Sequence, residues 1–131
     1  KPEGQIKGGS EKILFVDDEE SVVKLNHQLL ERLGYQVQST TKPLEALEWF
    51  KADPDQFDVI ITDMTMPRLT GDRLAAEVLK IRPQMSVIIC TGYSERMSTE
   101  KAEALGARKY LEKPIDLLNL ASSLREVIEG K

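Results

Sequence analysis

The sequence predicts an α/β fold with a five-stranded, doubly wound, parallel sheet, in which strands and helices alternate. Short apolar segments alternate along the chain with segments whose apolar residues recur every three or four positions. These two patterns are typical of strands and helices respectively. Three of the apolar segments are also continuously apolar and rich in β-branched residues, which is typical of strands buried on both faces of a parallel sheet.

Five short segments are expected to form the strands. The first, third and fourth are the continuous apolar runs, whereas the second and fifth are weaker examples. In chain order they are Ile13–Val16, Tyr35–Val37, Phe57–Ile61, Ser86–Cys90 and Lys109–Leu111. Because a helical segment separates each strand from the next, we expect neighbouring strands to run parallel and helices to cover both faces of the sheet.

The first helical segment lies between the first two expected strands. Its apolar residues recur at helical spacing, and Gly34 follows them as the expected C-terminal cap. Val23 and Leu30 lie to one side of this stripe, so they are candidates either for contacts with a partner or for core packing. The stripe itself consists of Val22, Leu25, Leu29 and Leu33.

Four further helices are expected. Pro43 opens the second helix, a position that proline favours. The third covers residues 71–81 and ends where Pro83 prevents its continuation. The fourth covers about residues 95–105, and the last begins after Asp116, an expected N-cap.

Composition and charge narrow the class of protein. With 131 residues the chain is long enough for one ordinary domain. Its net charge of −4 and pI of about 5.1 argue against nucleic acid and anionic membranes as partners. No apolar run approaches the ~20 residues that span a bilayer, and a single cysteine, Cys90, fits a reducing compartment. We therefore expect a cytoplasmic domain without membrane contact.

Residues 1–11 differ from the rest of the chain. They contain three glycines and only one sizeable apolar residue, Ile6. This composition is typical of a flexible linker or tail. We therefore expect the folded domain to comprise residues 12–131.

Polar residues follow four of the expected strands. Asp17 and Asp18 follow the first strand, Asp63 the third, and Thr91 and Lys113 the fourth and fifth. In open parallel sheets the ligand site lies beyond the carboxyl ends of the strands, so these side chains are expected to converge. Three crowded carboxylates would raise one another's pKa values unless a cation neutralised them. Mg²⁺, which prefers oxygen ligands, fits such a site.

These residues suit the transfer of a phosphoryl group. Mg²⁺ and Lys113 together would neutralise the oxygens of the group in flight. Asp63 would act as the nucleophile and form an aspartyl phosphate. The hydroxyl group of Thr91 would donate a hydrogen bond to a phosphoryl oxygen.

Simpler interpretations exist for each of these residues. Asp17 and Asp18 could cap the first helix, Lys113 could be a solvated charge, and Thr91 is a common strand residue. Asp63 could belong to an ordinary turn. A carboxylate directly after a buried strand is costly, however, unless a site uses it, and this favours the functional interpretation.

Four motifs, each at the end of an expected strand, together resemble the receiver domain of two-component response regulators. The resemblance extends from about Lys12 to Glu129. The motifs are Ile13-Leu14-Phe15-Val16-Asp17-Asp18-Glu19, Asp63-Met64-Thr65-Met66-Pro67 with Gly71, Thr91-Gly92, and Lys113-Pro114.

This resemblance implies a flavodoxin-like receiver fold and a role for each matched residue. Asp63 is the implied phosphoacceptor, and Lys113 is the cation that contacts the phosphoryl group. Thr91 and Tyr110 are the implied switch residues, although Tyr110 could equally pack in the core or at its rim. The implied ligands of Mg²⁺ are Asp17, Asp18, Asp63 and the backbone carbonyl of Thr65.

The resemblance also implies partners. The phosphoryl group would come from a phosphohistidine of a histidine kinase or a histidine phosphotransfer domain. The isolated domain would catalyse its own phosphorylation and dephosphorylation, and Thr65 and Tyr93 are expected to affect how long the phosphoryl group remains. The fourth helix, fifth strand and fifth helix form a possible homodimer face. The segment 8–14 resembles the linker before the C-terminal receiver of hybrid sensor histidine kinases.

Two other functions compete with this interpretation. A phosphatase of the haloacid dehalogenase type also uses a nucleophilic aspartate, but it needs a second aspartate where this chain has Thr65. A pseudo-receiver would keep the fold as a protein-binding module that is never phosphorylated. Because all the key residues of the receiver pattern are present, a phosphorylated receiver is the favoured interpretation.

Overall fold

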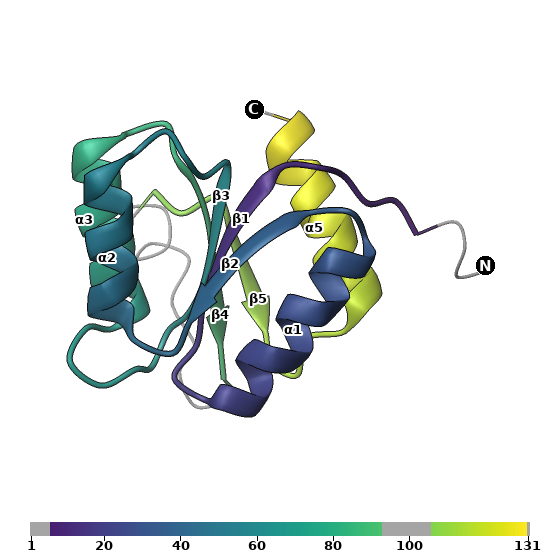
Figure 1. Ribbon diagram of the computed structural model, residues 1–131, viewed down its shortest axis with the longest axis horizontal. Coiled ribbons are helices and arrows are strands. Elements are labelled where there is room, and N and C mark those ends of the chain that lie inside the picture. The colour runs from purple at the N-terminus through teal and green to yellow at the C-terminus, as the bar shows by residue number, and fades with distance from the viewer. Residues whose placement is uncertain (1–5, 93–105, 131) are drawn as a thin grey trace.

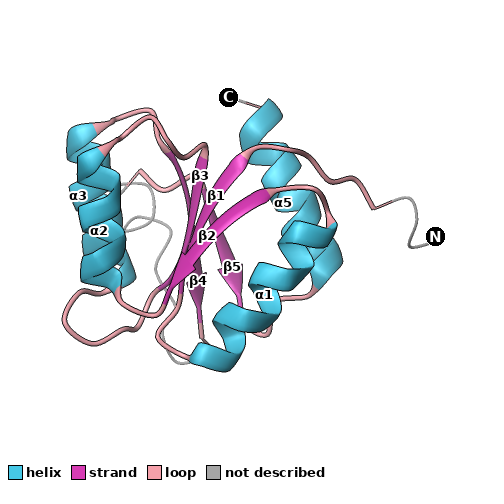
Figure 2. Ribbon diagram, viewed as in Figure 1, coloured by secondary structure: helices cyan, strands magenta, loops and turns pink. Residues whose placement is uncertain are grey.

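The computed structural model describes residues 6–92 and 106–130 and shows one parallel sheet covered by helices on both faces (Figures 1 and 2). The five strands lie in the order β2-β1-β3-β4-β5. They are β1 (Lys12–Val16), β2 (Gln36–Thr40), β3 (Val59–Asp63), β4 (Ser86–Thr91) and β5 (Lys109–Glu112), and the helices are α1 (Glu20–Arg32), α2 (Pro43–Ala52), α3 (Gly71–Ile81) and α5 (Leu117–Glu129). The predicted fold is confirmed.

The strand order reverses between β1 and β3, and all four strand pairings are parallel. Val16 at the end of β1 lies beside Thr62 of β3, and Asp63 lies beside Cys90 of β4. The carboxyl ends of these strands therefore meet at the point where the strand order changes, which is where open parallel sheets bind ligands.

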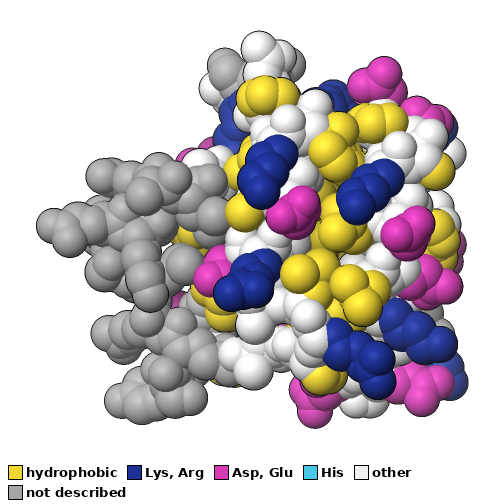
Figure 3. All heavy atoms as spheres, turned by 90° about the vertical axis from the view of Figure 1, so that its left-hand side faces the viewer, with side chains coloured by type: hydrophobic (Ala, Val, Ile, Leu, Met, Phe, Trp, Pro, Cys, Tyr) yellow, Lys and Arg dark blue, Asp and Glu magenta, His cyan; other side chains and the backbone are white. Residues whose placement is uncertain are grey.

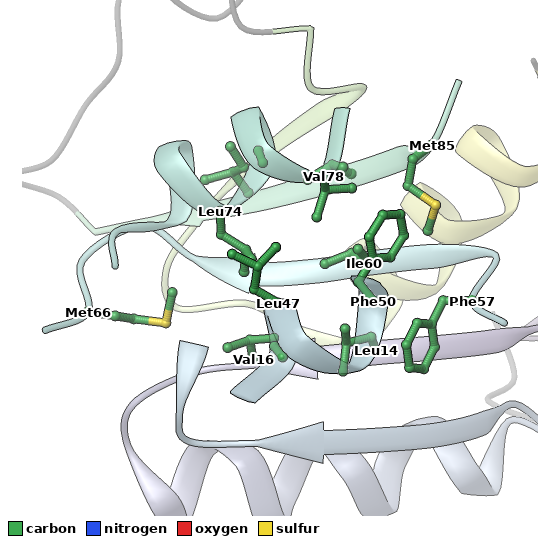
Figure 4. Close-up of a cluster of buried hydrophobic side chains, with 14 of the residues drawn as sticks. Leu14, Val16, Leu47, Phe50, Phe57, Ile60, Met66, Leu74, Val78 and Met85 are labelled. Carbon is green, nitrogen blue, oxygen red and sulfur yellow. The ribbon is translucent and has the colours of Figure 1, made fainter. Parts of the chain in front are cut away.

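Two apolar cores lie on opposite faces of the sheet. Along β1, Leu14 and Val16 belong to the core under α2 and α3, whereas Ile13 and Phe15 belong to the core under α1 and α5. Figure 4 shows the first of these cores. Both sets are buried because successive side chains of a strand point to opposite faces. This explains why β1 and β3 are continuously apolar rather than alternating.

The buried face of α1 differs from the predicted stripe. Val23 and Leu30 are buried in the core, whereas Leu25 of the predicted stripe is 56% exposed. The helix has a second row of core positions that includes the polar residue Asn26. Because Asn26 interrupts the apolar pattern of this row, the sequence does not indicate that the row is buried. The side-chain amide of Asn26 donates a hydrogen bond to the Val22 carbonyl, 2.9 Å away, which allows its burial. The predicted stripe is therefore wrong at Leu25.

The predicted helix ends are confirmed where the structure describes them. Gly34 follows α1 with a φ of +102°, and its N–H donates to the Glu31 carbonyl. α3 has the predicted bounds, and a carboxylate oxygen of Asp116 accepts a hydrogen bond from the Asn119 N–H at the start of α5. The expected fourth helix, residues 95–105, lies outside the described residues.

The surface of α2 and α3 carries both signs of charge. Figure 3 shows apolar side chains in the middle of this face, with Lys, Arg, Asp and Glu side chains around them. Leu44 and Ile81 are the large apolar residues that these two helices expose, at 47% and 41%. Among residues 6–92 and 106–130, no helix is both long enough and apolar enough to cross a membrane.

Candidate functional site

The predicted site residues come together at the carboxyl edge of the sheet. Asp17 directly follows β1, Asp63 ends β3, Thr91 ends β4, and Lys113 directly follows β5. Asp17 and Asp63 are only 2% and 5% exposed, and Thr91 is also buried. Buried carboxylates at this position require partners of opposite charge.

Three aspartates form a compact acidic cluster. Asp17, Asp18 and Asp63 each offer a carboxylate oxygen within 4.8 Å of the others, and Asp18 is exposed while the other two are buried. Neither Asp17 nor Asp18 caps α1, because the N-cap residue is Glu19, and the backbone N–H that the Asp17 carboxylate accepts among the described residues is that of Glu19 and not one inside the helix. The capping interpretation is therefore not supported.

Lys113 is the cation that faces this cluster. Its Nζ atom lies 2.7 Å from Oδ1 of Asp63 and 3.3 Å from Oδ2 of Asp17. Burial alone would lower the pKa of Lys113, but the contact with Asp63 and the charge of Asp17 raise it above its ordinary value. Lys113 is thus held as a cation by the site and is not an ordinary solvated charge.

The charges around Asp63 are not balanced. Burial raises the pKa of Asp63 to about 6, and the charges of Asp17 and Asp18 add to this effect while Lys113 opposes it. Oδ1 of Asp63 is also buried and accepts no hydrogen bond of good geometry from the described residues, although it is ion-paired with Lys113. Three oxygen donors that face one ammonium group fit a hard divalent cation.

The turn after β3 keeps Asp63 in place. The N–H of Met64 donates to the Cys90 carbonyl, which continues the pairing of β3 with β4 for one residue. The N–H of Gly71 donates to the Met64 carbonyl at 2.7 Å. A Cβ atom at Gly71 would collide with the Asp63 carbonyl oxygen, so only glycine allows α3 to start this close to the site. Thr65, in the same turn, is exposed.

Arg68 is the feature of this turn that the sequence did not predict. Its φ is +73°, and it is the only non-glycine residue in the described ranges with a positive φ. Arginine has no local side-chain preference for this conformation, so no pattern in the sequence could have indicated it. Strain of this kind clusters beside functional sites.

The two expected switch residues lie on neighbouring strands. The Thr91 carbonyl accepts the N–H of Lys113 at 2.8 Å, so the end of β4 is tied to the residue that faces the acids. Tyr110 is half-buried and packs against the core under α2 and α3. Its hydroxyl group is buried without a partner among the described residues, and burial and the charge of Asp72 raise its pKa. Tyr93 lies outside the described residues.

Comparison with known proteins gives one family. The model of the response regulator receiver domain matches residues 13–125. The sensor kinase CckA of Brucella abortus (strain 2308) is 31% identical over 121 residues, and the DNA-binding transcriptional regulator NtrC of Azospirillum brasilense is 35% identical over 118 residues. These alignments cover 92% and 90% of this chain but 13% and 24% of those proteins, so the chain spans a minor part of their length.

Solved structures agree with the sequence relatives. A response regulator receiver domain protein from Clostridium thermocellum is 36% identical, with a TM-score of 0.87, and the match covers 92% of this chain and 95% of that one. A CheY-like receiver domain protein from Methanospirillum hungatei JF-1 is 29% identical, with a TM-score of 0.81 and coverage of 93% and 96%. In both cases nearly the whole folded chain is shared.

Proposed function

Since the chain belongs to the response regulator receiver family, we propose that it accepts a phosphoryl group on Asp63 from a phosphohistidine and signals by a change of conformation. One observation carries this proposal. The Oδ1 atom of Asp63 is buried at the sheet edge, pairs with Lys113 alone among the described residues, and faces two further carboxylates. Such an arrangement leaves an oxygen available for a new bond.

The proposed reaction moves the phosphoryl group from nitrogen to oxygen. A carboxylate oxygen of Asp63 bonds to phosphorus while the phosphorus–nitrogen bond of the phosphohistidine breaks. The electron pair of that bond stays on the imidazole nitrogen, and the product is an acyl phosphate on Asp63. Lys113 lies 2.7 Å from the attacking group and would pair with the oxygens of the transferred group.

Asp17, Asp18, Asp63 and the backbone carbonyl of Thr65 would hold Mg²⁺. The close carboxylate oxygens and the raised pKa of Asp63 support this assignment, because both indicate a shortage of positive charge. When bound, Mg²⁺ supplies charge neutralisation for the carboxylates and the phosphoryl oxygens. Asp17, which Lys113 also contacts at 3.3 Å, would orient both cations toward Asp63.

Thr91 and Tyr110 would couple the phosphoryl group on Asp63 to a change of conformation at the surface. The hydroxyl group of Thr91 would donate a hydrogen bond to a phosphoryl oxygen, and Tyr110 would change its packing when Thr91 moves. The burial of Thr91 at the end of β4 supports these roles, as does the Tyr110 hydroxyl group, which has no partner among the described residues. The fourth helix, β5 and α5 would then be the face that dimerises or contacts an output partner.

The donor would be a histidine kinase or a histidine phosphotransfer domain in the cytoplasm. Leu25 of α1 and Leu118 of α5 are 56% and 59% exposed, and both helices cover the same face of the sheet. We assign the docking contacts to these residues in place of Val23 and Leu30, which the core uses. A hybrid sensor kinase is our proposed parent, because the sensor kinase CckA is among the relatives.

Acetyl phosphate with Mg²⁺ provides a direct test, read by the intact mass of the chain. We expect the wild-type chain to gain one phosphoryl group and Asp63→Asn to gain none. Asp58→Asn is the matched control, because Asp58 lies just before the other end of β3, where its carboxylate accepts the N–H of Lys12. A wild-type chain that gains no mass would identify a pseudo-receiver and overturn the proposal.

A further inference from the structure

The segment of residues 7–11, which we call the N-terminal strap, lies against the turn between α1 and β2. The strap shares backbone hydrogen bonds with this turn, as an added stretch of extended chain would. The Gly9 N–H donates to the Leu33 carbonyl at 3.0 Å, the Gln36 N–H donates to the Glu11 carbonyl at 3.0 Å, and the Gln36 side-chain amide donates to the Ser10 carbonyl at 3.1 Å. The strap therefore extends β1 at its N-terminal end, on the side that faces β2.

Glycines on both sides of this contact allow the close approach. A Cβ atom at Gly8 would collide with the Leu33 carbonyl oxygen, and one at Gly9 would lie 2.8 Å from the ring of Tyr35. Gly34, across the contact, has a φ of +102°, and a Cβ atom there would collide with the Gly9 carbonyl oxygen. These three glycines are thus needed for close packing. In the sequence alone, Gly8 and Gly9 are instead typical of a flexible linker.

Arg125 of α5 fixes the strap from the other side. Its Nη1 atom donates to Oε1 of Glu11 at 2.9 Å, to the Tyr35 hydroxyl group at 3.3 Å and to the Gly8 carbonyl at 3.4 Å. The Nη2 atom pairs with Glu129 at 2.9 Å. The side chain of Arg125 is only 16% exposed, and only the planar fork of a guanidinium group can serve these partners together.

The ionisation of Glu11 is consistent with this contact. Partial burial raises the pKa of Glu11, but the hydrogen bond from Arg125, the charge of Arg125 and backbone hydrogen bonds together outweigh burial, and the pKa lies below its ordinary value. Lys7, at the start of the strap, pairs with Glu129 at 3.1 Å, and both side chains are largely exposed. The exposed pair adds little, so the Arg125–Glu11 contact is the main ionic attachment.

We propose that the strap is a docking segment that attaches the chain preceding the domain rigidly to α5 and to the turn after α1. The preceding chain would then leave the domain in one fixed direction. Through Arg125, this chain would also be connected to α5, the helix that follows Lys113 closely in the sequence. This proposal is independent of phosphorylation at Asp63, because none of the strap contacts involves the acidic site. It differs from the flexible linker of residues 1–11 that the composition predicts, and the boundary between that linker and a domain of residues 12–131 stays a prediction.

Backbone ¹⁵N relaxation of the full 131-residue chain tests the proposal. We expect order parameters of about 0.85 for residues 8–11 in the wild type, equal to those of the strands. In Arg125→Met the values for the strap should fall below about 0.6 while those of the strands are unchanged. Lys109→Met is the matched control. It removes the 2.7 Å ion pair between Lys109 of β5 and Glu126, which lies on α5 like Arg125, and it removes no strap contact.

A second variant covers the case in which Arg125→Met does not fold. Gly8→Val adds bulk at the strap alone, and it should release the strap to order parameters below about 0.6 with the fold intact. The proposal is overturned if the wild-type strap already has such low values. It is also overturned if the strap keeps values of about 0.85 in Gly8→Val.

Discussion

Asp63 carries the proposed function, and it lies among more charge of its own sign than of the opposite sign. Lys113 is its only close cation among the described residues, whereas Asp17 and Asp18 both repel it. Burial raises its pKa to about 6, above its ordinary value near 3.8. A buried carboxylate in such surroundings destabilises the folded state when it is ionised. Destabilisation of this kind is common for residues that are kept for function.

Stability without metal should therefore fall as the pH rises from about 4 to 6. The folded chain binds the Asp63 proton more tightly than the unfolded chain, so this proton stabilises the fold below the pKa and is lost above it. Asp63→Asn should lack this slope and be more stable by on the order of 1–2 kcal/mol at pH 7. Urea unfolding at pH 4 and pH 7 measures both effects, and equal slopes for the two proteins would contradict the assignment.

Arg68 should lose strain when it is replaced by glycine. Its φ of +73° is costly for arginine and free of cost for glycine. We expect Arg68→Gly to stabilise the chain by about 1 kcal/mol in chemical unfolding. Arg73→Gly is the control, because Arg73 is an exposed helical residue of α3, and there the same change should destabilise. A loss of stability in Arg68→Gly would show that the arginine side chain compensates for its backbone.

At the scale of elements, the sequence predicted α3 and the ends of α1 and α5 well because local chemistry sets them. Proline, glycine and an aspartate N-cap act within one turn of their own position. The buried face of α1 was harder to predict because two rows of residues compete for it. The row with Leu25 is more apolar, but the row with Asn26 is buried. Its burial is possible because the Asn26 side-chain amide donates a hydrogen bond to the Val22 carbonyl.

The two leucines of α1 should respond differently to truncation. Leu30 is fully buried, so Leu30→Ala should cost about 2–5 kcal/mol of unfolding free energy. Leu25→Ala should change stability by less than about 0.5 kcal/mol but should slow phosphoryl transfer from a histidine kinase. Acetyl phosphate, which needs no docking, should phosphorylate Leu25→Ala at the wild-type rate. A Leu25→Ala variant that receives phosphate from the kinase at the normal rate would remove α1 from the docking surface.

The start of α3 should not tolerate a larger residue. Helix propensity alone predicts that Gly71→Ala would stabilise α3 by about 1 kcal/mol. A Cβ atom would instead collide with the Asp63 carbonyl oxygen and press on Met64, so we expect a net loss of stability and slower phosphorylation of Asp63. Glu77→Ala, on the same helix, is the control and should be near neutral. A Gly71→Ala variant with normal stability and phosphorylation would show that the turn can move.

At the scale of the whole molecule, the alternation of strands and helices was sufficient to predict the sheet and the edge that carries the site. The second strand was the least clear, because β2 is an edge strand in which exposed and partly buried residues alternate. Distances could not be predicted. That Lys113 contacts both Asp63 and Asp17 depends on the register of β4 and β5, which is a tertiary property.

Mg²⁺ should stabilise the molecule as a whole. Ligand that binds only the folded state at 100 times its Kd adds about 2.7 kcal/mol. We expect thermal unfolding to shift upward with added Mg²⁺ in the wild type and in Asp58→Asn, which leaves the acidic cluster intact. Asp17→Asn should lose most of the shift. A shift of the same size in Asp17→Asn would place the metal elsewhere.

The chemical identity of the phosphorylated residue tests the proposed function most directly. After reaction with acetyl phosphate and Mg²⁺, borohydride reduces an acyl phosphate of aspartate to homoserine, and peptide mass spectrometry locates the change. We predict homoserine at position 63 and at no other aspartate, with none formed when Mg²⁺ is omitted. Homoserine at Asp17 or Asp18, or a phosphoryl group that borohydride leaves in place, would contradict the assignment of Asp63 as the phosphoacceptor.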